Sequence, residues 1–188
     1  MRASAWKTLL MLGMAWLALW PAFGQAQTSI EQQVKGAFLT KFPLFVDWPA
    51  GTFASPSSPI VIGILGKNPF GDGFEREMSR QKAKSRSFQL KLLPGLDGLK
   101  ECHILYIHPE QDGRLADVLA RLGRAPVLVA GDAAGFAERG GMINFIKREG
   151  KVRFQVNLEA VRAAGLRVDA RLLQVSEVIK PPKSKPPD

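Results

Sequence analysis

The stretch IVIGIL, residues 60–65, decides the fold. It is apolar on both faces and rich in β-branched residues, a pattern typical of a central strand that is buried on two sides. The proline-bounded segment PSSP precedes it and glycines follow it, so a loop is expected at each end. Such a strand belongs in a layered protein, with a sheet between other elements.

Three further segments resemble strands. SFQLKLL (residues 87–93) alternates Phe88, Leu90 and Leu92 with polar neighbours, while HILYI (103–107) and PVLVA (126–130) are short apolar runs. Helical patterns separate several of these strands. This alternation predicts an α/β layered sandwich with a mainly parallel central sheet.

The expected helices begin at capping residues. Ser29, followed by Gln32, forms a capping-box pattern, and Asp72 and Asp112 are predicted N-caps further along the chain. Gly123 is expected to end the helix that follows Asp112. The apolar residues that predict the buried stripe of the first helix are Ile30, Val34, Ala37, Phe38 and Phe42.

The segment GGMINFIKREGKVRFQVN, residues 140–157, predicts an antiparallel hairpin at the sheet edge. Two strand-like runs flank Glu149 and Gly150, and glycine supplies the positive φ of a tight turn. Asn157 is expected to cap a following helix, which Gly165 closes. RLLQVSEVI (171–179) predicts a last strand, before the proline-rich tail at residues 181–188, which we expect to be disordered.

The chain begins with a predicted secretory signal. Arg2 and Lys7 precede the 13-residue apolar run Thr8–Trp20, which is shorter than the ~20 residues that span a bilayer. Cleavage after Gly24 or Ala26 fits the small-residue rule. We therefore expect a signal peptide at residues 1–26 and one periplasmic domain at residues 27–180, without direct membrane insertion.

Composition limits the chemistry of the exported chain. The signal holds two of the 26 basic residues and none of the 17 acidic ones, so the remainder carries a formal net charge of +7. Cys102 is the single cysteine, which excludes an intrachain disulfide and predicts a small buried side chain. The basic stretch at residues 76–86 lacks the interleaved aromatics of a nucleic-acid site, so we expect a solvated surface and no nucleic-acid binding.

Catalytic and metal-binding patterns are weak. The sequence has no GxSxG elbow, and its glycines after residue 65 lack the spacing of a dinucleotide or phosphate loop. His103 and His108 lie five residues apart, on opposite faces of one strand, which disfavours a shared metal. Asp132 resembles a helix cap. We expect no enzyme activity, metal or cofactor.

The order of four segments resembles the YfiR-like family of periplasmic proteins over nearly the whole exported chain. The segments are AFLTKFPLFVDWP, IVIGILGKNPFG, CHILYI and the long run from VLVAGD to LLQVSEVI. The resemblance implies a dimeric α/β protein that binds and represses the periplasmic domain of an inner-membrane diguanylate cyclase. Cyclic-di-GMP and biofilm formation would then fall. Its best-known members have paired cysteines, so the lone Cys102 departs from their pattern.

Two sets of residues are candidates for binding. Phe45, Trp48 and Phe70 are expected to form a partner or dimer surface, because large aromatics dominate binding hot spots. Alternatively, the protein is a periplasmic module that binds a small anion or nucleotide near Gly66 and Asn68, at the end of the strand 60–65. The hairpin itself is expected to complete the sheet edge as scaffold.

Overall fold

The computed structural model describes residues 29–180. The predicted signal at residues 1–26 and the predicted tail at residues 181–188 lie outside the described residues. Of the helices within residues 29–180, none reaches the length and apolar character that crossing a bilayer requires.

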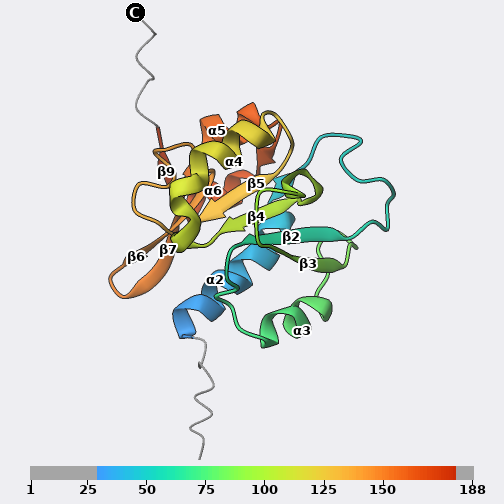
Figure 1. Cartoon of the computed structure of the whole chain (residues 1–188), viewed down its shortest axis with the longest axis horizontal. Helices are drawn as coiled ribbons and strands as arrows, with labels where there is room; N and C mark the ends of the chain where they lie inside the picture. The colour runs from blue at the N-terminus through green and yellow to red at the C-terminus, as the bar shows by residue number, and fades with distance from the viewer. Residues whose placement is uncertain (1–28, 181–188) are drawn as a thin grey trace, which may run out of the picture.

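Within residues 29–180 the centre is a seven-stranded sheet (Figure 1). Its first five strands pair in parallel, the next pair is antiparallel, and the last pair is parallel. The α/β fold with a mainly parallel sheet is therefore confirmed. The strands in spatial order are β3 (Phe88–Leu93), β2 (Ile60–Leu65), β4 (Ile104–Ile107), β5 (Leu128–Gly131), β6 (Ile143–Arg148), β7 (Lys151–Asn157) and β9 (Glu177–Ile179).

Helices lie on both sides of this sheet, α2 and α3 below it and α4, α5 and α6 above it in the view of Figure 1. A small antiparallel sheet joins β1 (Val46–Asp47) to β8 (Arg167–Val168). The α-helices are α2 (Ile30–Lys41), α3 (Gly73–Ser79), α4 (Leu115–Leu122), α5 (Leu158–Ala163) and α6 (Ala170–Gln174). Short 3₁₀ turns are η1 (Phe42–Leu44), η2 (Leu99–Glu101) and η3 (Pro109–Arg114).

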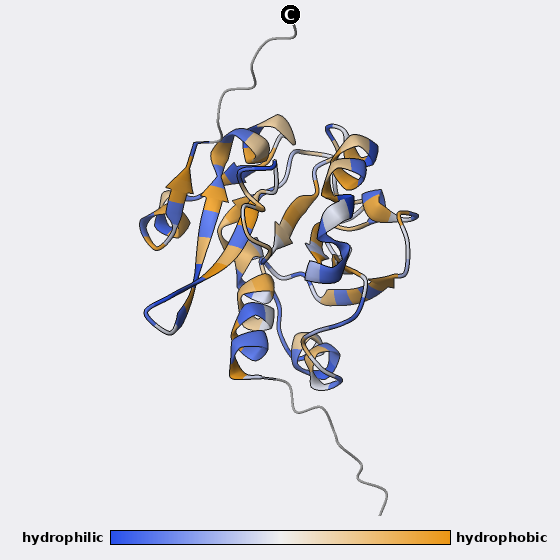
Figure 2. Ribbon diagram, turned by 60° about the vertical axis from the view of Figure 1, so that its left-hand side comes forward, coloured by the Kyte–Doolittle hydropathy of each residue, from blue (hydrophilic) through white to orange (hydrophobic). Residues whose placement is uncertain are grey.

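The core lies on both faces of β2, β4 and β5. All four residues of β4 and of β5 are buried, and Val61 is the one partly exposed residue of β2. Figure 2 shows the strands at the centre of the sheet largely in orange, the colour of hydrophobic residues. Because other elements cover both faces of the three strands, their sequences are continuous apolar runs.

Helix α2 begins as expected, but it buries a different face. The Ser29 hydroxyl accepts a hydrogen bond from the Gln32 amide at 3.2 Å, which confirms the predicted cap. The predicted stripe is wrong for its first three members, because Ile30, Val34 and Ala37 are exposed, whereas Phe38 and Phe42 pack against the core. The residues of α2 that face the core are Lys35, Gly36, Leu39 and Thr40.

An aromatic cluster joins the end of α2 to the hairpin. The ring of Phe42 lies 5.9 Å from that of Phe145 and 5.4 Å from that of Phe154, measured between centroids. Phe38 lies 5.3 Å from Phe154. Such spacings are favourable for aromatic pairs. The cluster fixes α2 against β6 and β7.

The hairpin forms at the predicted residues. Strands β6 and β7 pair antiparallel from Ile143 opposite Val156 to Arg148 opposite Lys151. Glu149 and Gly150 both have positive φ, 50° and 74°, as a two-residue type I′ turn requires. The outermost strand at this end of the sheet is β9, which pairs with β7, so the hairpin lies next to the edge.

Three local predictions are wrong. Asp112 is not an N-cap, because Pro109 starts the turn η3 earlier and the His108 side chain caps it by accepting from the Glu110 amide. The segment 171–179 is helical before it becomes β9, since Asp169 caps α6. The predicted alternation of Phe88, Leu90 and Leu92 fails at the end of β3. Leu92 is 56 % exposed at the sheet edge, and Leu93 is buried instead.

Candidate functional site

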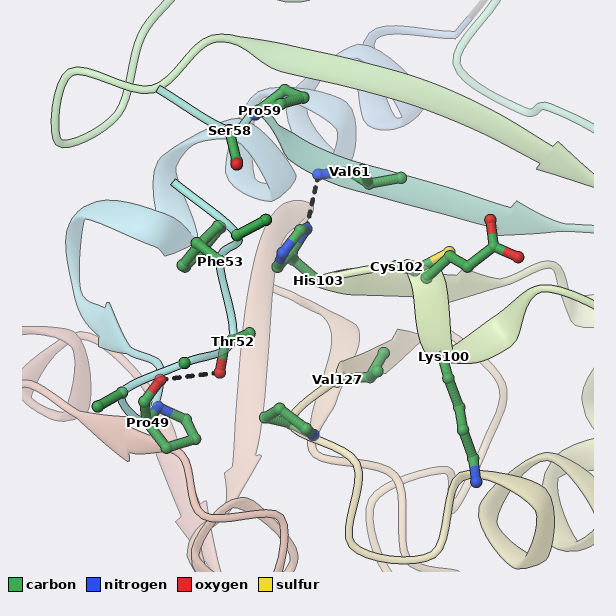
Figure 3. A pocket seen from close by; sticks show the side chains of 15 residues that line it. Pro49, Thr52, Phe53, Ser58, Pro59, Val61, Lys100, Cys102, His103 and Val127 are labelled. Atoms are coloured by element: carbon green, nitrogen blue, oxygen red, sulfur yellow. Dashed lines mark hydrogen bonds between the residues drawn. The ribbon is translucent and has the colours of Figure 1, made fainter. Parts of the chain in front are cut away.

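A pocket of about 620 Å³ opens at the amino ends of β2, β4 and β5 (Figure 3). The loop at residues 49–54 forms one wall, and residues 100–103, before β4, form another. Pro126 and Val127, before β5, complete it. The pocket therefore lies at the end of the sheet opposite to Gly66.

Phe53 organises the pocket wall. Its ring stacks on His103 at 4.3 Å with 7° between the planes, and the guanidinium of Arg86 lies 3.9 Å from its centroid. The Phe53 ring is thus held between an imidazole and a cation. Arg86 also donates to the carbonyls of Ser55 and Ser58 at 2.8 Å each, which ties the loop to the strand that follows.

His103 accepts a hydrogen bond in the wall of the pocket. Its Nδ1 accepts from the Val61 amide at 3.0 Å, so the neutral ring carries its proton on Nε2. Burial, and then the charge of Arg86, lower the pKa of His103. The imidazole therefore stays neutral near pH 7 and is not placed to act as a general base through Nδ1.

Trp48 adds a second donor beside the pocket. Its ring meets Phe53 and His103 edge to face, at 6.0 and 6.4 Å. The indole Nε1 is buried and has no hydrogen-bond partner among the described residues. An unpaired buried N–H costs free energy, which the ring contacts of Trp48 must offset.

Cys102 lies at the inner end of the pocket as an unreactive thiol. It is 3 % exposed, and a methyl group on the adjacent Gly63 would overlap its sulfur. Burial raises the pKa of the Cys102 thiol to about 11, with smaller opposing effects of Lys91 and Glu101. The predicted small buried side chain is confirmed.

The raised pKa predicts slow chemistry at this thiol. At pH 8 the folded protein is expected to react with Ellman's reagent at least about tenfold more slowly than the protein in 6 M guanidinium chloride, because only the thiolate attacks. Equal rates in the two states would contradict the buried position. Absorbance at 412 nm measures both rates.

The aromatic residues predicted for a partner surface do not form one cluster. Phe45 is half-buried under Arg171, whose guanidinium lies 5.5 Å from its ring centroid, and Trp48 is half-buried beside the pocket. Phe70 is only 4 % exposed and contacts Phe74 and Tyr106. Its assignment to an exposed surface is corrected: the loop after β2 folds the ring into the core.

Gly66 and Asn68 lie at the carboxyl end of β2, where the strand order reverses. Gly66 has φ +95°, and an added methyl would lie 2.8 Å from the Gln111 side chain and 3.2 Å from that of His108. Asn68 accepts from the Phe70 amide at 2.9 Å and donates to the Gly71 carbonyl at 3.4 Å. Both residues thus shape the loop that carries Phe70.

A buried ion pair under α2 was missed by the sequence reading. Lys35 Nζ lies 2.6 Å from Asp132 Oδ2 and 2.7 Å from Glu31 Oε1. The expected capping role of Asp132 is wrong, because turns follow it and its carboxylate points to α2. Burial alone would lower the pKa of Lys35, but its hydrogen bonds to the two carboxylates raise it overall.

Tyr106 lies close to this ion pair. Burial, followed by the charge of Asp132, raises the pKa of its hydroxyl, which stays protonated. Within residues 29–180 the Tyr106 hydroxyl and Asp132 Oδ1 form no hydrogen bond of regular geometry, but a weaker side-chain interaction between Tyr106 and Asp132 contributes to the raised pKa. The sequence gives one weak signal for the buried position of Lys35. This lysine lies one helical turn before the buried Leu39, and therefore on the same face of α2.

The described residues hold no group of three or more histidine, cysteine or acidic side chains that could bind a metal. A search of curated proteins finds no match. A protein-family model described as YfiR/HmsC-like matches residues 32–177, which includes every strand of the central sheet at least in part and the whole pocket. The chain therefore belongs to the YfiR/HmsC-like family.

Proposed function

We propose that the protein is a non-enzymatic periplasmic regulator. It binds the periplasmic domain of an inner-membrane diguanylate cyclase and represses it, so that cyclic-di-GMP and biofilm formation fall. The family match over residues 32–177 carries this proposal. The neutral His103, whose Nδ1 is occupied by the Val61 amide, and the protonated Cys102 supply no activated nucleophile in the pocket, which agrees with a binding role.

The partner surface is proposed to include the segment from Phe45 to Phe53. This segment holds half-buried aromatic rings on a loop beside an open pocket. Aromatic side chains that are partly exposed and already fixed by packing lose little entropy on binding, which makes them effective anchors. Arg86 and His103 fix Phe53, and Phe53 in turn supports Trp48.

Two experiments test the proposed function: deletion of the gene, and capture of the partner by the tagged protein. Deleting the gene is expected to raise cellular cyclic-di-GMP and biofilm mass, and the tagged protein is expected to capture a cyclase from solubilised inner membranes. Unchanged cyclic-di-GMP together with no captured cyclase would overturn the proposed function.

Trp48 gives the residue-level prediction. Trp48→Ala is expected to weaken capture of the cyclase domain by roughly 30-fold, as loss of a hot-spot residue costs about 2 kcal/mol. Val175→Ala, at a 58 % exposed position away from the pocket, is the control and should bind like the wild type. Calorimetry measures affinity, and thermal melts confirm folding. Equal affinities for wild type and Trp48→Ala would remove Trp48 from the interface.

A second candidate function is small-anion binding in the same pocket. The Nε2 proton of the neutral His103 and the cation of Lys100, both on residues that line the pocket, favour an acceptor such as a carboxylate. A true ligand must raise the melting temperature as its concentration rises. A panel of organic acids and nucleotides that leaves the melting temperature unchanged would exclude this alternative.

A further inference from the structure

His103 fastens the loop that walls the pocket, residues 49–59, to strand β2. Its Nδ1 accepts the amide hydrogen of Val61 at 3.0 Å, and its ring stacks on Phe53 of the loop at 4.3 Å (Figure 3). An imidazole nitrogen accepts a hydrogen bond only while it carries no proton. The contact to Val61 therefore exists only while His103 is neutral.

Arg86 supports the same loop from the other face of Phe53. Its guanidinium lies 3.9 Å from the ring centroid and donates to the carbonyls of Ser55 and Ser58 at 2.8 Å each. Because an arginine in a protein stays charged, this support does not depend on pH. Of the two groups that hold Phe53, His103 is thus the one that a change of pH can remove.

The charges around His103 oppose its protonated form. The segments that hold its ring carry the titratable side chains of Asp47, Lys84, Arg86, Lys100, Glu101 and Cys102. Both carboxylates are already in ion pairs, Asp47 with Lys84 and Glu101 with Lys91. Burial, and then the charge of Arg86, lower the pKa of His103 below its usual 6.5. A proton on His103 therefore costs free energy while the loop stays in place.

We propose that protonation of His103 releases the loop at residues 49–59 from β2, so that this loop opens the pocket in acid. A proton on Nδ1 would point at the Val61 amide, and two donors would meet at 3.0 Å. The ring must then turn away, which ends its parallel stacking on Phe53. Phe53 would keep Arg86 alone as its support.

The direction of the pH effect follows from the lowered pKa. In the released loop the imidazole is solvated and regains the usual value of 6.5, so the closed loop has its full advantage above that pH. This advantage is lost as the pH falls through the lowered value of the closed form. Acid therefore favours the open loop.

Release of the loop would also affect the proposed regulation. Phe53 belongs to the segment proposed as the partner surface, so an acidic periplasm would weaken binding of the cyclase domain. This consequence rests on the proposed function. Release itself is a property of this chain alone, and it is tested without a partner.

Hydrogen exchange of the exported chain, residues 27–188, tests the release. The protection factor of the Val61 amide is expected to fall by up to about tenfold per pH unit below 6.5, because opening then takes up one proton. The Met142 amide, bonded to the Val129 carbonyl at 3.0 Å in the middle of the sheet, is the control and should keep its protection. The fall should coincide with the titration of the His103 ring, followed by NMR.

Trp48 gives a second readout, because it is the only tryptophan of residues 27–188 and its ring meets those of Phe53 and His103. Quenching of its fluorescence by acrylamide, a neutral molecule, is expected to increase between pH 8 and pH 5. Protection of Val61 and quenching of Trp48 that both stay constant over this range would overturn the inference in the wild type itself.

His103→Asn separates titration from a structural role. The asparagine oxygen takes the place of Nδ1 as acceptor for Val61 and does not titrate, so the pH dependence of both readouts should disappear. His108→Asn makes the same exchange at the other histidine, whose Nδ1 accepts from the Glu110 amide, and should keep the wild-type pH dependence. A His103→Asn protein that also keeps it would sink the inference.

Discussion

Lys35→Ala is expected to lower the free energy of unfolding by about 3–5 kcal/mol, as loss of one partner of a buried ion pair does. The side chains of Lys35 and Asp132 are each 6 % exposed, with 2.6 Å between nitrogen and oxygen. Without the ammonium, the carboxylate of Asp132 would stay buried without its counter-charge, beside the Tyr106 hydroxyl. Urea denaturation monitored by tryptophan fluorescence gives the change.

Lys147→Ala is the matched control. Lys147 contacts the same Glu31 at 3.5 Å, but its side chain is 63 % exposed, so its loss should cost less than about 1 kcal/mol. Similar costs for the two lysines would contradict the importance of burial. Lys35→Met combined with Asp132→Leu should recover part of the loss, because neither charge of that pair then remains buried.

The raised pKa of Lys35 also fixes the sign of a pH effect. A lysine whose pKa is higher in the folded state than its usual 10.5 stabilises the fold fully below that pH. Its contribution is lost as pH rises through the folded value. The free energy of unfolding of Lys35→Ala should therefore fall less steeply than that of the wild type as the pH rises above 10.5.

The sequence predicted the architecture because its signals are local. IVIGIL is buried on both faces, and the hairpin turns at Glu149 and Gly150 as expected. Ser29 and Asn157 both cap helices through their side chains. In each case a few neighbouring residues determine the local structure, so tertiary contacts were not needed to predict it.

The ion pair was beyond this local reading, because Lys35 and Asp132 are 97 residues apart in sequence. It also explains the misplaced stripe of α2. Apolar periodicity counts Lys35 as a solvent residue, yet Asp132 draws it into the core and turns Ile30 and Val34 outward. The error thus concealed the exposed apolar residues of α2.

The pocket could not be predicted from the sequence either. Phe53, Arg86 and His103 come from three separate segments, and in none of them does the local pattern indicate a site. Trp48 was predicted for its residue type, whereas its unpaired N–H is a tertiary property. Sequence reasoning can therefore nominate an aromatic residue, but only the fold determines which of its atoms a partner can reach.

Phe42→Ala is expected to cost about 3–5 kcal/mol, the range for truncating a buried phenylalanine. Phe42 has no exposed surface, and its ring meets Phe145 and Phe154 from the two strands of the hairpin. The cavity left behind would lie between α2 and the sheet, where rigid strands limit collapse. Thermal and urea unfolding measure the loss.

Leu44→Ala, two residues later and 39 % exposed, controls for a change in the same turn and should cost less than about 1 kcal/mol. Phe154→Ala provides the coupling test, because residues in contact lose stability non-additively. If the hairpin is the scaffold for α2, the Phe42→Ala and Phe154→Ala double variant should lose less than the two single losses combined, since the second truncation removes contacts already gone. Strict additivity would mean that α2 and the hairpin are stabilised independently, which would contradict the scaffold role.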